Sequence, residues 1–137
     1  MYPTFKISKE DTLKLLKSYI EPKYGYSDST ITTKVILGCS NYRDYEPDRV
    51  EFEIITKKDL GLGIGESSIV LSIDEKEAIL ILKNKLIESD IQVNNIKFEL
   101  ITGYERGSGN SKLFDGTAIG IKTLEDLNIR KVKSLNR

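Results

Sequence analysis

Two similar heptapeptides constrain the fold of this chain more than any other feature. The stretch VEFEIIT at residues 50–56 is nearly repeated as IKFELIT at residues 96–102. In both, apolar and charged residues alternate, which predicts strands with one buried and one solvent-facing side. Each copy is followed by a glycine-containing loop, a second apolar run and an acidic helix start. We therefore expect an internal ββα duplication, with units at 50–89 and 96–135.

Capping residues and helical periodicity predict the helices around these strands. Ser8 with Asp11 fits a capping box for a helix over residues 8–20, and Ser72 with Glu75 fits one for a helix that ends near residue 89. Thr123 with Asp126 predicts a third, short helix. The apolar run 78–82 also fits a hairpin strand, but the polar arc that follows it favours the helix.

The strands complete an α+β fold in a single domain, residues 1–137. Strands are predicted over residues 31–37, 50–54, 68–73, 96–100 and 118–121. The paired strands are expected to be joined by long loops at 57–68 and 103–117. The element order is then α-β-β-β-α-β-β-α. It favours a mainly antiparallel sheet of about five strands with the helices packed on one face.

Composition narrows the cellular context and the partners. The 137 residues suit one core, and no apolar run approaches the roughly 20 residues that cross a bilayer. The start of the chain lacks the pattern of a secretory signal, and the single Cys39 has no second cysteine for a disulfide, so we expect a cytoplasmic protein without membrane contact. The 21 basic and 21 acidic residues cancel, which disfavours nucleic acid as a partner.

The absence of histidine limits the chemistry of the chain. Its 137 residues contain none, which removes the commonest general base near neutral pH and the commonest transition-metal ligand. Ser-His-Asp and Cys-His catalytic sites are therefore excluded within one chain. Any catalysis must come from Asp, Glu, Lys, Tyr or Ser side chains.

The segment GLGIGESS at residues 61–68 is the strongest local anomaly. Three glycines at alternate positions permit positive φ angles and close backbone approach, which a phosphate cradle would use. The spacing and the lysine of a Walker loop are missing, and a flexible hairpin tip explains the glycines as well. Leu62 and Ile64 between the glycines would be exposed on such a tip, which favours a hydrophobic contact with a protein partner or a second copy of the chain.

Two further segments carry residues typical of binding surfaces. Residues 103–112 offer a ring, two cations and small polar groups, a mixture suited to a phosphate-bearing ligand or a protein interface, although a mobile loop explains them too. Tyrosines on both sides of the first strand, with an arginine, resemble interface anchors, but half-buried tyrosines that cap a core also fit. The candidate contact residues are Tyr42, Arg43, Tyr45, Leu62, Ile64, Tyr104, Arg106 and Lys112.

Carboxylates supply an enzymatic alternative. Pro47-Asp48 followed by Asp74-x-Lys76 resembles the metal-binding pattern of the PD-(D/E)xK nucleases, as does the element order of residues 8–102. That resemblance implies that Asp48 and Asp74 hold magnesium and that Lys76 orients the attacking water. In element order, residues 8–89 also resemble double-stranded RNA-binding domains. The acidic stretch 74–77 stands where that family has a lysine cluster, and it would repel phosphate.

Our first hypothesis is a non-enzymatic binding protein without a cofactor. The abundance of lysine and isoleucine indicates a bacterial or phage origin. Immunity proteins, inhibitors of host defence and ligand sponges are of this size and class. The partner would be a protein or a small phosphate-bearing ligand, with the two glycine loops and residues 42–48 as the contact surface. The alternative is a magnesium-dependent nuclease or phosphohydrolase, and a homodimer is compatible with both.

Overall fold

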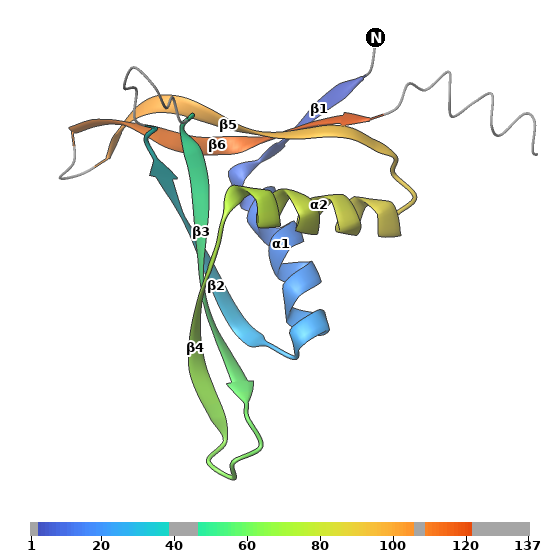
Figure 1. Cartoon of the computed structure of the whole chain (residues 1–137), viewed down its shortest axis with the longest axis vertical. Helices are drawn as coiled ribbons and strands as arrows, with labels where there is room; N and C mark the ends of the chain where they lie inside the picture. Colours follow the sequence, from blue (N-terminus) through green and yellow to red (C-terminus); the bar gives the residue numbers. More distant parts are fainter. Residues whose placement is uncertain (1–2, 39–46, 106–108, 122–137) are drawn as a thin grey trace, which may run out of the picture.

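The chain folds into two small antiparallel sheets and two helices (Figure 1). The computed structural model describes residues 3–38, 47–105 and 109–121, with only the backbone described at 103–105 and 109–111. One sheet has the strand order β1-β6-β5 and the other β2-β3-β4. Along the chain the elements are β1 (Thr4–Ser8), α1 (Lys9–Tyr24), β2 (Ser27–Ile36), β3 (Arg49–Asp59), β4 (Glu66–Ile73), α2 (Glu75–Glu88), β5 (Val93–Glu105) and β6 (Gly109–Ile121).

The α+β class and the antiparallel pairing are confirmed, but the expected single sheet of about five strands is wrong. The expectation missed β1, which does alternate polar and apolar residues but is only five residues long and largely exposed. β1 pairs with β6, more than 100 residues away, along the register Thr4 to Gly120 through Ser8 to Gly116. This distant pairing adds a third strand to the β5–β6 pair.

The first helix begins as the sequence predicts. The Ser8 hydroxyl accepts a hydrogen bond from the Asp11 amide at 3.1 Å. The helix ends at Gly25, whose φ of 69° is left-handed and whose backbone N–H donates to the Glu21 carbonyl. This helix therefore extends several residues beyond the predicted end and includes Pro22.

The second helix has a different cap from the predicted one. Asp74 is the N-cap, and its carboxylate accepts from the Glu77 amide at 2.8 Å. Ser72 is still part of β4, where its hydroxyl donates to Glu51 at 2.6 Å across the sheet. The strand continues one residue past Ser72, so the helix cannot begin there.

The strands are longer and the connections shorter than predicted. β3 and β4 leave only residues 60–65 between them, in place of a loop over 57–68. β5 and β6 pair as far as Glu105 and Gly109, so most of the predicted loop over 103–117 is a hairpin. The register of this hairpin shifts between Glu99, which pairs with Gly116, and Leu100, which pairs with Phe114.

The core lies where the two sheets and the two helices meet. Phe52 on β3, Phe98 on β5 and Phe114 on β6 pack edge to face, with ring centroids 5.4 to 5.8 Å apart. Leu16 of α1 and Leu82 of α2 are fully buried in the same cluster. Each helix contacts strands of both sheets, and both helices lie in the corner between them (Figure 1).

The two halves of the described chain share one element order, βαββ. Within each half the last two strands pair with each other, and the first strand pairs with the other half's last strand. The two helices match at a constant shift of 66 positions. Their N-caps are residues 8 and 74. The buried positions are 12, 16 and 20 in α1 and 78, 82 and 86 in α2.

The expected ββα duplication is not confirmed by this topology. Of the two echoed heptapeptides, one lies in β3, the middle strand of its sheet, and the other in β5, an edge strand, so they do not occupy equivalent places. The predicted third helix and Cys39 lie outside the described residues. Within the part that the structure describes, no helix is long and apolar enough to span a membrane.

Candidate functional site

The predicted contact segments lie at opposite ends of the molecule, so the two glycine loops do not converge on one site. The tip at 60–65 follows β3, and the β5–β6 hairpin lies near the start of β3 (Figure 1). The eleven residues of β3 separate the two by about 35 Å at about 3.3 Å per residue. The sequence could not give this distance, because it depends on which strands share a sheet.

The tip of the β3–β4 hairpin is apolar and exposed. Leu60, Leu62 and Ile64 have 51%, 69% and 71% of their surface accessible. The glycines between and after them, 61, 63 and 65, have φ angles of 78°, 78° and 82°, which favour glycine. The first turn is held by Asp59, whose carboxylate accepts from the Gly61 amide at 2.8 Å. The alternation of glycine and aliphatic residues therefore presents three large apolar side chains to solvent.

At the other end, an ion pair holds the β2–β3 connection against the β5–β6 hairpin. The Lys112 ammonium lies 2.6 Å from one Asp48 oxygen, and the Gly38 amide donates to the other oxygen at 2.8 Å. Both interactions favour the ionised carboxylate, the Lys112 bond most, and lower the pKa of Asp48 below its usual value. The ends of two predicted contact segments, residues 42–48 and 103–112, are thus brought together.

Several predicted contact residues cannot be placed individually. Tyr42, Arg43, Tyr45 and Arg106 lie outside the described residues, and only the backbone of Tyr104 is described, within β5. Of the eight candidate contact residues, the structure describes the side chains of the remaining three, Leu62, Ile64 and Lys112.

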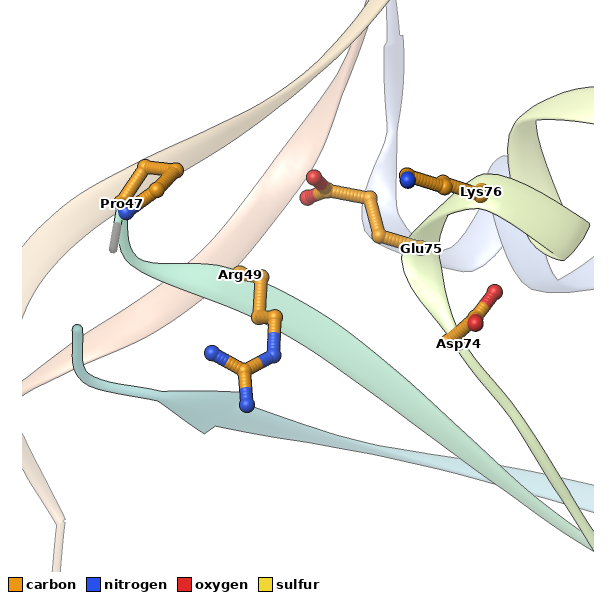
Figure 2. A pocket seen from close by; sticks show the side chains of 5 residues that line it. All are labelled: Pro47, Arg49, Asp74, Glu75 and Lys76. Carbon is orange, nitrogen blue, oxygen red and sulfur yellow. The ribbon is translucent and has the colours of Figure 1, made fainter. Parts of the chain in front are cut away.

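The carboxylates of the nuclease alternative are each engaged elsewhere. Asp48 binds Lys112 and Gly38, while Asp74 caps α2. A pocket of about 390 Å³ beside the start of α2 is lined by Pro47, Arg49, Asp74, Glu75 and Lys76 (Figure 2). The neighbours of Asp48 on both sides face this pocket, whereas its own carboxylate binds Lys112 and Gly38.

The described residues contain no group of three or more cysteine, aspartate and glutamate side chains that could hold a metal ion. Glu75, which lines the same pocket, accepts a bond from the Val50 amide at 3.4 Å. This arrangement therefore offers no positive support for a magnesium site at Asp48, Asp74 and Lys76, and that hypothesis stays a prediction.

A groove between the C-terminal parts of the helices was not anticipated as a site. Ser18, Tyr19, Pro22 and Lys23 of α1 line it together with Lys85 and Glu88 of α2, around a volume of about 580 Å³. The sequence does carry a signal, because Tyr19 and Lys23 are four residues apart and share one face of a helix. Tyr24 and Tyr26 are among the tyrosines that flank the first predicted strand, but only the fold shows that the Lys23 ammonium lies over the Tyr24 ring and that Tyr24 stacks on Tyr26.

Comparison with known proteins assigns the chain to no family. No family model matches the chain, and no characterised protein or solved structure matches it either.

Proposed function

We propose that this chain is a non-enzymatic binding protein that inserts the apolar tip of its β3–β4 hairpin into a protein partner. The observation that carries the proposal is the exposure of Leu60, Leu62 and Ile64 in a six-residue turn. Single exposed apolar residues are common on protein surfaces, but three large ones in one turn are typical of contact sites. An apolar cavity of a partner would shield all three together.

The hairpin is built to hold this tip away from the core. The three left-handed glycines have open space around them, with no atom within 4 Å of a Cβ built at any of them, so packing does not explain the turn. The pairing of β3 with β4 continues to Asp59 and Glu66, which fixes the base of the turn. A preformed tip loses little conformational freedom on binding.

More specifically, we propose that the chain is an inhibitor or an immunity protein. Such proteins act by occupying a surface of another protein, which requires exposed contact residues and no reaction chemistry. The partner is a different protein or a second copy of the chain, and the test below separates the two.

Native mass spectrometry of the protein purified gently from its own host tests the proposal. We expect the wild-type chain to retain a partner, and the double variant Leu62→Ser, Ile64→Ser to lose it. Val70→Ser is the matched control, because Val70 is 65% exposed on the same hairpin but lies on the sheet and not at the tip. A partner of the same mass as the chain would identify self-association. Equal retention by the tip variant would refute the proposal.

A photo-crosslinking residue at position 62 provides a second test that does not require a complex to survive purification. In host cells, we expect adducts from position 62 and none from position 14, where Lys14 is exposed on α1. Adducts at both positions in equal yield would also contradict the role of the tip.

A further inference from the structure

Tyrosines and lysines form a continuous row from α1 to the end of β3. The Lys23 ammonium lies 5.0 Å from the ring centroid of Tyr19 and 5.6 Å from that of Tyr24. Tyr24 stacks on Tyr26 with centroids 5.6 Å apart, and the Lys58 ammonium lies 5.7 Å from the Tyr26 ring. Each ammonium is thereby positioned by aromatic faces. We call these five residues the tyrosine–lysine row.

One end of the tyrosine–lysine row lines the groove between the helices. The groove volume of about 580 Å³ lies within the range of roughly 300 to 1,000 Å³ that is typical of small-molecule sites. Lys23 enters from α1 and Lys85 from α2, so two cations from different elements face one space. A site assembled from two helices keeps its shape as long as the fold is intact.

The Tyr19 hydroxyl is arranged as a donor toward the groove. It accepts one hydrogen bond from Lys23 at 3.0 Å and a longer one from Asn84 at 3.5 Å. Because these contacts use the oxygen as an acceptor, its own proton remains available for an acceptor in the groove. The Lys23 bond, followed by the Asn84 bond, lowers the pKa of Tyr19, which makes the hydroxyl a stronger donor.

The one acidic residue that lines the groove, Glu88, is only weakly paired with Lys85. Glu88 lies 4.0 Å from Lys85, at the limit of an ion pair, and 60% of the Glu88 side chain is exposed. Such a pair contributes little and is easily displaced by a ligand. The remaining groove groups are the Ser18 hydroxyl, which donates to the Leu15 carbonyl at 2.8 Å, and the apolar Pro22.

We propose that the groove between α1 and α2 binds the phosphate group of a small molecule, held by Lys23, Lys85 and the Tyr19 hydroxyl. Two ammonium groups and a hydroxyl donor match the several acceptor oxygens and the negative charge of a phosphate. Tyr24, with 45% of its surface exposed beside Lys23, offers a ring for contact if the phosphate belongs to a nucleotide. This site is separate from the apolar tip, so its function does not depend on the proposed protein partner.

Calorimetric titration of the full chain with ADP and with inorganic pyrophosphate tests the site. We expect at least one probe to bind, and Lys23→Gln and Lys85→Gln each to weaken binding about tenfold, because each removes a charge-assisted contact. Tighter binding of ADP than of pyrophosphate would identify a nucleotide as the source of the phosphate, and equal binding a phosphate group alone. Lys14→Gln is the matched control on the exposed side of α1 and should bind as the wild type does.

Two further measurements check that the probe binds in the groove and that the variants remain folded. Tyr19→Phe keeps the ring but loses the donor, so we expect binding to weaken several-fold while the circular dichroism spectrum is unchanged. Amide chemical shifts should change for residues 18–21, 23 and 85–88 on addition of the probe. The proposal is overturned if neither probe binds up to millimolar concentration, or if the Lys23 and Lys85 variants bind as well as Lys14→Gln does.

Discussion

Thr12 shows how one residue couples a helix to a distant strand. It is fully buried on α1, and its hydroxyl lies 2.8 Å from that of the equally buried Thr117 on β6. Thr12 also donates to the Ser8 carbonyl at 2.8 Å. A hydroxyl has one proton, so Thr117 must donate to Thr12.

This direction predicts unequal effects of two similar substitutions. Thr12→Val leaves the buried Thr117 donor without its acceptor, and we expect a loss of about 2 kcal/mol in the free energy of unfolding. Thr117→Val leaves the Thr12 bond to Ser8 intact and should cost less than about 1 kcal/mol. Urea denaturation of both variants and of the double variant checks this. Equal costs for the two single variants would contradict the assigned direction.

Of the glycines whose surroundings the structure describes, Gly116 is the one that neighbouring backbone constrains most. Its φ is 153°, and a Cβ built there would lie 2.4 Å from the Ile7 carbonyl oxygen of β1. At Gly63 the φ is 78°, but no atom lies within 4 Å of such a Cβ. The two positions therefore separate a steric clash from conformational strain alone.

We expect Gly116→Ala to destabilise the protein by about 3 kcal/mol and Gly63→Ala by about 1 kcal/mol. For a chain of this size, each kcal/mol lowers the melting temperature by about 4 °C. Thermal denaturation followed by circular dichroism compares them. A smaller effect at 116 than at 63 would mean that β1 is not paired with β6 as described.

At the scale of elements, the Asp48–Lys112 ion pair connects the start of β3 to β6. Because Lys112 and the Gly38 amide favour the carboxylate, the folded-state pKa of Asp48 is lower than its unfolded-state value. The stabilisation is therefore present above the unfolded-state pKa of about 4 and is lost as the pH falls through the folded-state pKa.

Nuclear magnetic resonance titration of the side-chain carboxyl groups measures this effect. We expect Asp48 to titrate below the usual range in the wild type and closer to it in Lys112→Gln. In Asp48→Asn, the free energy of unfolding should fall less steeply below pH 4 than in the wild type. An Asp48 titration that Lys112→Gln does not change would rule out the ion pair as the link between these elements.

The elements differ in how far the sequence could define them. Alternation of apolar and charged residues located β3 and β5, and the Ser8 cap located α1, because these signals lie within a few neighbouring residues. β1 alternates as well, but over five residues only, and its partner β6 lies more than 100 residues away, where no local signal points to it. The tip residues Leu62 and Ile64 could be expected to be exposed, whereas the groove at Tyr19 requires two helices to be placed side by side.

At the scale of the whole molecule, strand exchange and one aromatic cluster join the two sheets. Each βαββ half gives its first strand to the other half's sheet, so neither sheet is complete without both halves. Phe52, Phe98 and Phe114 connect the two sheets in the core. The sequence repeat of residues 50–56 at 96–102 could not reveal this arrangement. It shows that two segments are alike, but not which strands they pair with.

The shared core predicts that the two sheets unfold together. Circular dichroism, which follows both sheets and helices, and tyrosine fluorescence should give coincident transitions in urea. Phe98→Leu removes part of the ring contacts with β3 and β6, and we expect a loss of about 1 to 2 kcal/mol with one transition retained. Phe98→Ala should cost about 3 to 5 kcal/mol and lower the midpoint further. Two separate transitions in the wild type would mean that each sheet is stable alone, which the exchanged strands and the shared phenylalanines argue against.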